Sequence, residues 1–282
     1  MPARQRIVLF GASGFVGGSL LHALVSPPSS TFASVLAVTS SDAKAAQIEA
    51  WGRWIGASLE TRVITSEHSW VAATPLAVEA DLVIQAATSD DLKLTEAINV
   101  GLKQGRRGSL IHFSGVQLIE SQPVGKYVET RLFNDLDLEA LAAIPESAAH
   151  RSIDLSIVDA VTRGELYGSI VCPALVWGTG RGPCKRVSAQ FPDLVAKALM
   201  NRSAVYVGEG TNRWTTVHID DLVDLSMHLV HHHLIDQKSQ HPPSAHSTFY
   251  FASHASSDQD FRSLARAVGE GLFDLGLLPS AD

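Results

Sequence analysis

The chain has 282 residues, of which 45% are hydrophobic and 18% are charged, and its net charge is −7 at pH 7. A chain of this length buries a large core without disulfides or metal ions, and its mildly acidic balance argues against non-specific binding to nucleic acids or anionic membranes. The two cysteines, Cys172 and Cys184, form no CxxC pair, which is typical of a reducing compartment. With no apolar run of roughly 18 residues and no signal-peptide pattern, the chain is expected to be cytoplasmic and not to cross a membrane.

Short apolar runs alternate with helix-like stretches in the first half of the chain. The pattern predicts strands at 7–10, 34–39, 61–65, 81–87 and 109–114, and helices at 14–25, 43–55 and 92–103. Strands that alternate with helices of this length predict βαβ units and a parallel sheet. Because the strands are continuously apolar, we expect both faces of that sheet to be covered.

The second half is less regular. A long connection, 115–150, contains a short helix near 136–143. The pattern then predicts helices at 152–162, 189–200, 220–231 and 260–272, strands at 169–176, 204–207 and 249–251, and an exposed loop at 236–247. We expect residues 1–173 to form the core, and residues 174–282 to supply the last core elements and a smaller lobe.

A glycine-rich turn follows the first predicted strand and opens the first predicted helix. Its glycines are Gly11, Gly14 and Gly17. In such a turn one glycine permits the tight bend, another lets the backbone approach a pyrophosphate, and the third lets helix and strand pack closely. The free N–H groups at the helix start then face the phosphates. The turn therefore predicts a dinucleotide site, to which Ser13, Phe15 and Val16 also belong.

The G-x-x-G-x-x-G spacing resembles the short-chain dehydrogenase/reductase superfamily, in particular its extended and atypical branches and NmrA-like proteins. Further matches are Ala86-Ala-Thr88, Phe113-Ser114-Gly115, the run Cys172-Pro-Ala-Leu-Val-Trp-Gly-Thr-Gly180 and the run Val217-His-Ile-Asp-Asp221. Within the superfamily the chain looks most like a fungal group of epimerase/dehydratase-like proteins.

This resemblance implies a fold and several site residues. The fold is an α/β Rossmann-type doubly wound parallel sheet with a smaller C-terminal substrate lobe. The resemblance also implies that Ala86, Ala87, Thr88 and Pro173 contact an NAD(P) cofactor and that Ser114 is the catalytic serine. A small-molecule substrate would lie between the nicotinamide and the lobe, and homodimers are common among relatives.

The end of the second predicted strand bears on the choice between NAD and NADP. An NAD enzyme usually places a carboxylate there to hold the ribose 2′-hydroxyl. Here the residues are Ser40 and Ser41, and no acid precedes Asp42. Ser40, Ser41 and Lys44 suit a 2′-phosphate, with Lys44 as a point charge, or are ordinary solvated loop residues. The sequence favours NADP over NAD.

The Tyr-x-x-x-Lys pair of superfamily reductases is missing at its usual place. One substitute, Tyr127, heads a Tyr-x-x-x-Arg, but arginine does not shuttle protons as lysine does. The other is His150 with Asp154, at the i, i+4 spacing that puts both side chains on one helix face. We predict that Asp154 orients His150 as an acid or base and that the Ser114 hydroxyl polarises the substrate. Asp154 alternatively interacts only with the helix dipole.

Three functions fit these residues. The first is an NAD(P)-dependent oxidoreductase or epimerase/dehydratase-like enzyme that acts on a small carbonyl or hydroxyl compound. The second is a non-catalytic NAD(P)-binding, redox-sensing regulator, and the third is a non-redox isomerase or dehydratase.

Two further features allow a functional or an ordinary interpretation. The basic loop 178–186 either binds a phosphate of the substrate or cofactor or is a mobile surface loop. The adjacent histidines at 231–233 point in different directions on a helix, so no metal is expected.

Overall fold

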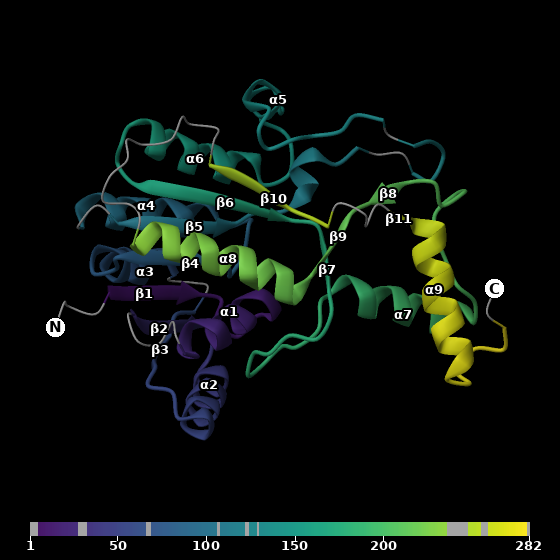
Figure 1. Ribbon diagram of the computed structural model, residues 1–282, viewed down its shortest axis with the longest axis horizontal. Coiled ribbons are helices and arrows are strands. Elements are labelled where there is room, and N and C mark those ends of the chain that lie inside the picture. The colour runs from purple at the N-terminus through teal and green to yellow at the C-terminus, as the bar shows by residue number, and fades with distance from the viewer. Residues whose placement is uncertain are drawn as a thin grey trace.

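A seven-stranded parallel sheet forms the centre of the protein (Figure 1). The computed structural model describes residues 5–27, 33–65, 69–105, 108–121, 124–128, 130–235, 248–254 and 259–280. The predicted loop at 236–247 lies outside these residues. The sheet has the order β10-β6-β5-β4-β1-β2-β3. Its strands are β1 (Gln5–Phe10), β2 (Ala33–Thr39), β3 (Glu60–Val63), β4 (Leu82–Gln85), β5 (Ser109–Phe113), β6 (Tyr167–Pro173) and β10 (Phe249–Ala252).

Helices cover both faces of this sheet. Alternate residues of β1 enter two different cores: Ile7 and Leu9 pack with α1 (Phe15–Val25), α2 (Asp42–Ile55) and α8 (Ile219–Leu234) on one face. Val8 and Phe10 pack with α3 (Ser69–Val78), α4 (Leu92–Gln104) and α6 (Arg151–Thr162) on the other. This arrangement confirms the predicted doubly wound α/β fold.

The strand order changes direction at β1. From β1 the sheet grows through β2 to β3 on one side, and it then continues from β4 through β5 and β6 on the other side. β1 pairs with β2 on one side and with β4 on the other, with Ile7 opposite both Val35 and Leu82. In open parallel sheets, ligands bind outside the carboxyl ends of the strands at this switch point. The glycine turn directly follows β1, so the fold places it at that crevice.

Smaller elements lie beyond the carboxyl ends of β5 and β6. β7 (Leu175–Trp177) pairs in parallel with β9 (Thr216–His218), and β8 (Arg213–Trp214) pairs antiparallel with β11 (Gln259–Asp260). The helices α7 (Gln190–Asn201) and α9 (Phe261–Asp274) pack against each other and lie apart from the sheet (Figure 1). The connection from β5 to α6 contains the 3-10 turn η3 (Val116–Ile119) and the short helix α5 (Leu138–Ala142).

Two predicted strands need correction, and one helix was not predicted. The expected strand at 169–176 is two strands, because after Pro173 the chain leaves the large sheet and β7 pairs with β9 instead. The expected strand at 204–207 does not form. The helix α3 was not predicted, and its sequence contains Pro75 and almost no polar face.

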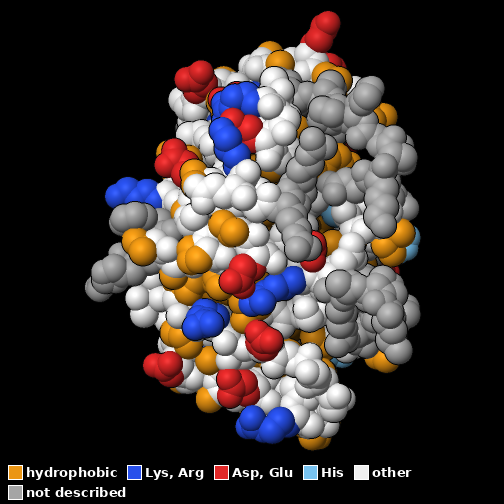
Figure 2. Space-filling view, turned by 90° about the vertical axis from the view of Figure 1, so that its left-hand side faces the viewer, with side chains coloured by type: hydrophobic (Ala, Val, Ile, Leu, Met, Phe, Trp, Pro, Cys, Tyr) orange, Lys and Arg blue, Asp and Glu red, His pale blue; other side chains and the backbone are white. Residues whose placement is uncertain are grey.

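The amino ends of the strands form a face of mixed charge. Figure 2 shows Lys and Arg side chains intermixed with Asp and Glu on this face. Arg6, at the start of β1, approaches Glu79 at 3.4 Å, and Lys103 lies 2.6 Å from Glu165. Solvent screens such surface pairs, so they add little to stability. The residues predicted to carry chemistry lie toward the opposite edge of the sheet.

Candidate active site

The glycine turn has the geometry that an anion site requires. Gly11 has a φ of +81°, and a Cβ there would overlap the carbonyl of Ala86. A Cβ on Gly17 would overlap the carbonyl of Gly11, so helix α1 packs directly on the turn. Gly14 is the N-cap of α1, with no side-chain cap and no acidic residue in the first turn. The first N–H groups of α1 are therefore left for an anion, which fits a dinucleotide pyrophosphate.

The other residues of the turn are held by its neighbours. The Ser13 hydroxyl accepts a hydrogen bond of 3.1 Å from Thr39, at the end of β2. The Phe15 side chain is buried, and a Cβ on Gly180 would lie 3.0 Å from its ring. Val16 is partly buried against the core below α1. The turn is thus fixed from both sides before any ligand binds.

The loop after β4 is tied down by Gln85, a residue that the sequence analysis missed. Gln85 is fully buried, and its Oε1 accepts a hydrogen bond of 2.9 Å from the Ala87 N–H, while its Nε2 donates to the Thr88 carbonyl at 2.8 Å. Ala86 lies against Gly11, as described. The segment Ala86–Thr88, predicted to contact the cofactor, therefore lies beside the glycine turn. The sequence signal for the role of Gln85 was a glutamine at the end of an apolar strand.

The predicted 2′-phosphate residues lie together at the end of β2. Lys44 Nζ donates to Ser40 Oγ at 3.1 Å, and both side chains are exposed. The Ser41 hydroxyl caps helix α2 by accepting from the Lys44 N–H. The Ser41 side chain thus caps the helix, whereas Ser40 and Lys44 present a hydroxyl and a cation to solvent at the start of α2.

The loop 178–186 folds back over α1. Gly182 lies against Gly18, and the Pro183 carbonyl accepts a hydrogen bond of 2.8 Å from Gln47 on α2. Arg181 forms an ion pair of 2.9 Å with Asp220 at the start of α8. Arg181, one of the basic residues of this loop, is therefore engaged by the protein itself.

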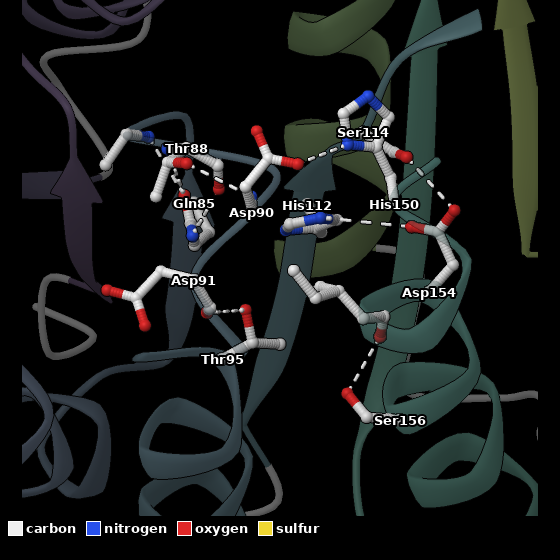
Figure 3. A network of polar contacts seen from close by, with 12 residues as sticks. Gln85, Thr88, Asp90, Asp91, Thr95, His112, Ser114, His150, Asp154 and Ser156 are labelled. Carbon is white, nitrogen blue, oxygen red and sulfur yellow. Dashed lines mark hydrogen bonds and ion pairs between the residues drawn. The ribbon is translucent and has the colours of Figure 1, made fainter. Parts of the chain in front are cut away.

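A buried polar cluster lies where β5 ends and α6 begins (Figure 3). The Ser114 hydroxyl donates to Asp154 Oδ2 at 3.0 Å, and both residues are buried. His112, two residues before Ser114 and so on the same face of β5, places Nε2 3.9 Å from Asp154 Oδ1. Arg151, also buried, donates to the carbonyl of Leu141.

Burial changes the charge state of this cluster. Desolvation raises the pKa of Asp154 to about 7, although the Ser114 hydrogen bond and the nearby Arg151 guanidinium both lower it. Desolvation also lowers the pKa of His112 to about 3, with a further contribution from His150. At neutral pH His112 is therefore uncharged, and Asp154 is poised between its two forms.

His150 belongs to a second pair, which corrects a prediction. Its Nδ1 lies 2.7 Å from Asp90 Oδ1 and its Nε2 lies 3.2 Å from Gln117 Oε1. The prediction that Asp154 orients His150 is wrong, because Asp154 turns inward to Ser114 while Asp90 reaches His150 from the loop after β4 (Figure 3). His150 is the N-cap of α6 and has a left-handed φ of +65°.

The remaining predicted positions lie elsewhere or at the edge of this site. Tyr127 is 50% exposed, and its carbonyl accepts a hydrogen bond from Thr211 in the segment before β8. Pro173 ends β6, two residues after Val171, whose carbonyl accepts the Ser114 N–H at 2.9 Å. The structure thus brings Ser114, Asp154 and His150 together, and adds Asp90, His112, Gln117 and Arg151.

The described residues hold neither a metal-binding cluster nor a membrane-spanning helix. No group of three or more His, Cys, Asp or Glu side chains in that part of the chain is arranged to hold a metal ion. Within the same residues, no helix has the length and apolar character needed to cross a membrane. Both cysteines are free thiols.

Comparisons with known proteins agree with the fold. The NAD dependent epimerase/dehydratase family model matches residues 147–241. The oxidase ucsJ of Acremonium sp. is 25% identical over 99% of this chain and 82% of its own length.

Solved structures share the fold at low identity. The PbgP3 protein of Burkholderia pseudomallei has a TM-score of 0.65 at 13% identity, covering 96% of this chain and 82% of its own. The UDP-glucuronic acid 4-epimerase of Bacillus cereus, solved with UDP-glucuronic acid and NAD, has a TM-score of 0.61 at 13% identity, covering 93% and 82%. A dTDP-glucose 4,6-dehydratase of Streptomyces venezuelae, solved with NAD, has a TM-score of 0.62 at 15% identity, covering 96% and 81%.

The strand order, the glycine turn at the switch point and these matches lead to one assignment. The chain has the Rossmann-type fold of these epimerases and dehydratases, and its residues 147–241 match the NAD dependent epimerase/dehydratase family model.

Proposed function

We propose that the chain is an NAD(P)-dependent oxidoreductase or epimerase/dehydratase-like enzyme for a small carbonyl or hydroxyl compound, with His150 in place of the usual tyrosine. The observation that carries this proposal is a pair of proton-carrying groups, each held by its own carboxylate. His150 contacts Asp90, and Ser114 contacts Asp154. Both pairs lie at the carboxyl end of β5, where the crevice of the sheet opens.

The cofactor would be held by residues of the crevice. Gly11, Ser13, Gly14, Phe15, Val16 and Gly17 would surround the pyrophosphate, with Ala86, Ala87, Thr88 and Pro173 along the rest of the molecule. Ser40, Ser41 and Lys44 favour NADP, because Lys44 adds a positive charge beside the ribose. When bound, the nicotinamide supplies the redox step, and the chain supplies positioning and proton transfer.

The contacts of His150 suit a proton donor. Its two ring nitrogens lie against oxygen atoms, Asp90 Oδ1 and Gln117 Oε1, so a ring N–H on either side has an acceptor. A substrate oxygen that displaces Gln117 would receive the Nε2 proton. Asp90 would hold the ring in place and stabilise its charge during the transfer. A left-handed histidine is strained, and such strain is retained chiefly at functional sites.

Asp154 sets the direction in which the Ser114 hydroxyl points. An ionised Asp154 accepts a hydrogen bond from the Ser114 hydroxyl, which then offers only its lone pairs to a substrate. A protonated Asp154 donates to Ser114 Oγ instead, which frees the serine proton for the substrate oxygen. Because the pKa of Asp154 is about 7, polarisation of a carbonyl by Ser114 should weaken above neutral pH.

The test is turnover by the purified protein with NADPH or NADH and a panel of ketones and aldehydes. The nicotinamide is deuterated at C4, and products are analysed by mass spectrometry. We expect deuterium in the product, with Ser114→Ala and His150→Asn each lowering kcat by on the order of a hundredfold without weakening nucleotide binding. Full turnover in the double variant would reject the proposed roles. Nucleotide binding with no chemistry on any compound would favour the redox-sensing regulator.

A further inference from the structure

A cavity of about 580 Å³ lies between the end of β7 and helix α7. This volume is in the range of sites for small organic molecules. The large side chains that line it are Trp177 from β7, Val187 from the following loop, and Phe191, Val195 and Leu199 from α7, with Ala196 between them.

The chemistry of the lining is apolar. None of the described residues that line the cavity is charged, and Ser188, which offers its one hydroxyl, is itself buried. The first turn of α7 carries Asp193, which pairs with Lys197 at 2.6 Å. A phosphate at that helix end would meet a carboxylate instead of a cation. The cavity is therefore poorly suited to a nucleotide diphosphate.

The apolar side chains of the cavity are unusually exposed. Trp177 is 45%, Val187 51% and Leu199 41% exposed. Exposed apolar residues that gather in a hollow mark a binding site, because they would otherwise be covered. The Trp177 indole also packs edge-on against the His218 ring, with 4.6 Å between the ring centroids. An aromatic wall that is in place before binding suits an apolar ligand.

The cavity lies beyond the carboxyl end of β6, the strand that contacts Ser114. The Ser114 N–H donates to the Val171 carbonyl at 2.9 Å, and Trp177 follows Val171 by only six residues. At 3.3 to 3.6 Å per residue, that segment spans at most about 20 Å. β7 also runs in parallel with β9, and its end at Trp177 opens toward α7.

We propose that this cavity binds the hydrophobic body of the substrate, so that the substrate is a carbonyl or hydroxyl compound with a large alkyl or aromatic group. This inference rests on the proposed function, since it places the reacting oxygen near Ser114 and His150. An apolar substrate would differ in class from the nucleotide sugars with which similar structures were solved. The sugar nucleotide of those proteins is charged, whereas this cavity is not.

The test uses isothermal titration calorimetry of the full chain with 2-alkanones from 2-butanone to 2-nonanone, with and without NADP, and with UDP-glucose as the charged comparator. Each added methylene should strengthen binding by up to about fourfold until the cavity is filled. Ala196→Trp fills the cavity and should abolish this dependence on chain length. Met200→Trp adds the same ring on α7 at a position that is 84% exposed and does not line the cavity, and it should leave the series unchanged.

The outcomes separate this proposal from the proposed function. A series that Ala196→Trp does not alter, or UDP-glucose binding more tightly than 2-nonanone, would overturn the cavity assignment. A dimer that Ala196→Trp dissociates, with no ketone binding, would overturn it too by showing a second copy on this surface. If neither NADPH nor NADH binds but the series responds to Ala196→Trp, the proposed function fails and the cavity remains a ligand site.

Discussion

His150 Nδ1 lies 2.7 Å from Oδ1 of Asp90, a carboxylate 60 residues earlier in the chain. The two residues come from different elements, the loop after β4 and the start of α6, and meet at the carboxyl edge of the sheet (Figure 3). This contact replaces the i, i+4 pairing that the sequence predicted for His150. It gives the imidazole an orienting acceptor and leaves Asp154 to the buried cluster with Ser114.

The first prediction concerns Asp90. Asp90→Asn keeps the shape of the side chain but removes its charge, so the protonated form of His150 loses its stabilising partner. We expect kcat to fall about tenfold to a hundredfold with KM nearly unchanged. Steady-state kinetics at several pH values measures this. Asp91→Asn is the matched control, since Asp91 caps α4 by accepting from the Leu94 N–H and asparagine caps equally well. Equal losses in both variants would contradict a role specific to Asp90.

The second prediction concerns the backbone of His150. Its left-handed φ of +65° favours glycine, whereas alanine there keeps the strain. His150→Gly should therefore unfold with a free energy about 1 kcal/mol higher than that of His150→Ala, while both variants lose activity. Urea denaturation of the two variants gives the difference. If the alanine variant is the more stable one, the strained conformation is not retained in solution.

The third prediction follows from the raised pKa of Asp154. Between its ordinary value of 3.8 and about 7, the folded chain keeps a proton that the unfolded chain has released. The contribution of Asp154 to stability therefore falls as pH rises through this window, by at most about 1.4 kcal/mol per pH unit. Above pH 7 the loss is complete.

Asp154→Asn removes this dependence. The difference in unfolding free energy, wild type minus variant, should decline from about pH 4 to pH 7 and then level off. The pKa values of His112 and His233, both lowered to about 3, give the opposite slope in both proteins and cancel in the difference. Asp159→Asn, at an exposed carboxylate of the same helix, should show a flat difference. A flat difference for Asp154→Asn would show that its pKa is not raised.

The fourth prediction concerns the choice of nucleotide. Lys44→Ala removes the cation beside Ser40 and should weaken NADPH binding about tenfold while leaving NADH binding unchanged. Nicotinamide fluorescence titrations measure both affinities. Lys93→Ala, at an exposed lysine on α4, is the control. Equal changes for the two nucleotides in Lys44→Ala would remove the argument for NADP.

The sequence predicted the sheet well where its signals are local. The strands around the glycine turn are short apolar runs, and each ends at a glycine or a polar residue. The helix α3 was not predicted because it is apolar almost throughout and contains Pro75. Its sequence therefore lacks the periodic alternation of apolar and polar residues that marks a surface helix. The run Ala204–Val207 looked like a strand from β-branched and aromatic residues, but strand propensity needs a pairing partner to take effect.

The site was predictable only in part for a similar reason. Ser114 and the glycine turn are marked by motifs, and His112 lies two residues before Ser114 on the same strand face. The contacts of His150 with Asp90 and Gln117 join segments that are distant in sequence. No local pattern encodes such contacts, because they depend on how β4, β5 and α6 meet at one edge of the sheet.

We propose above all that Gly11, Gly14 and Gly17 form the binding site of a nicotinamide dinucleotide. The most direct measurement is a fluorescence titration with NADPH and NADH of the wild type, Gly14→Asp and Gly14→Asn. Gly14 has a φ of −75° that any residue adopts, and either side chain would cap α1. A Cβ in either variant would lie 3.2 Å from the Gly11 carbonyl oxygen, so both variants meet the same backbone contact and should be equally able to fold. We expect the wild type to bind NADPH, and the aspartate variant to lose at least tenfold more affinity than the asparagine variant because its charge repels the pyrophosphate. No binding of either nucleotide by the wild type, or equal binding by the two variants, would contradict it.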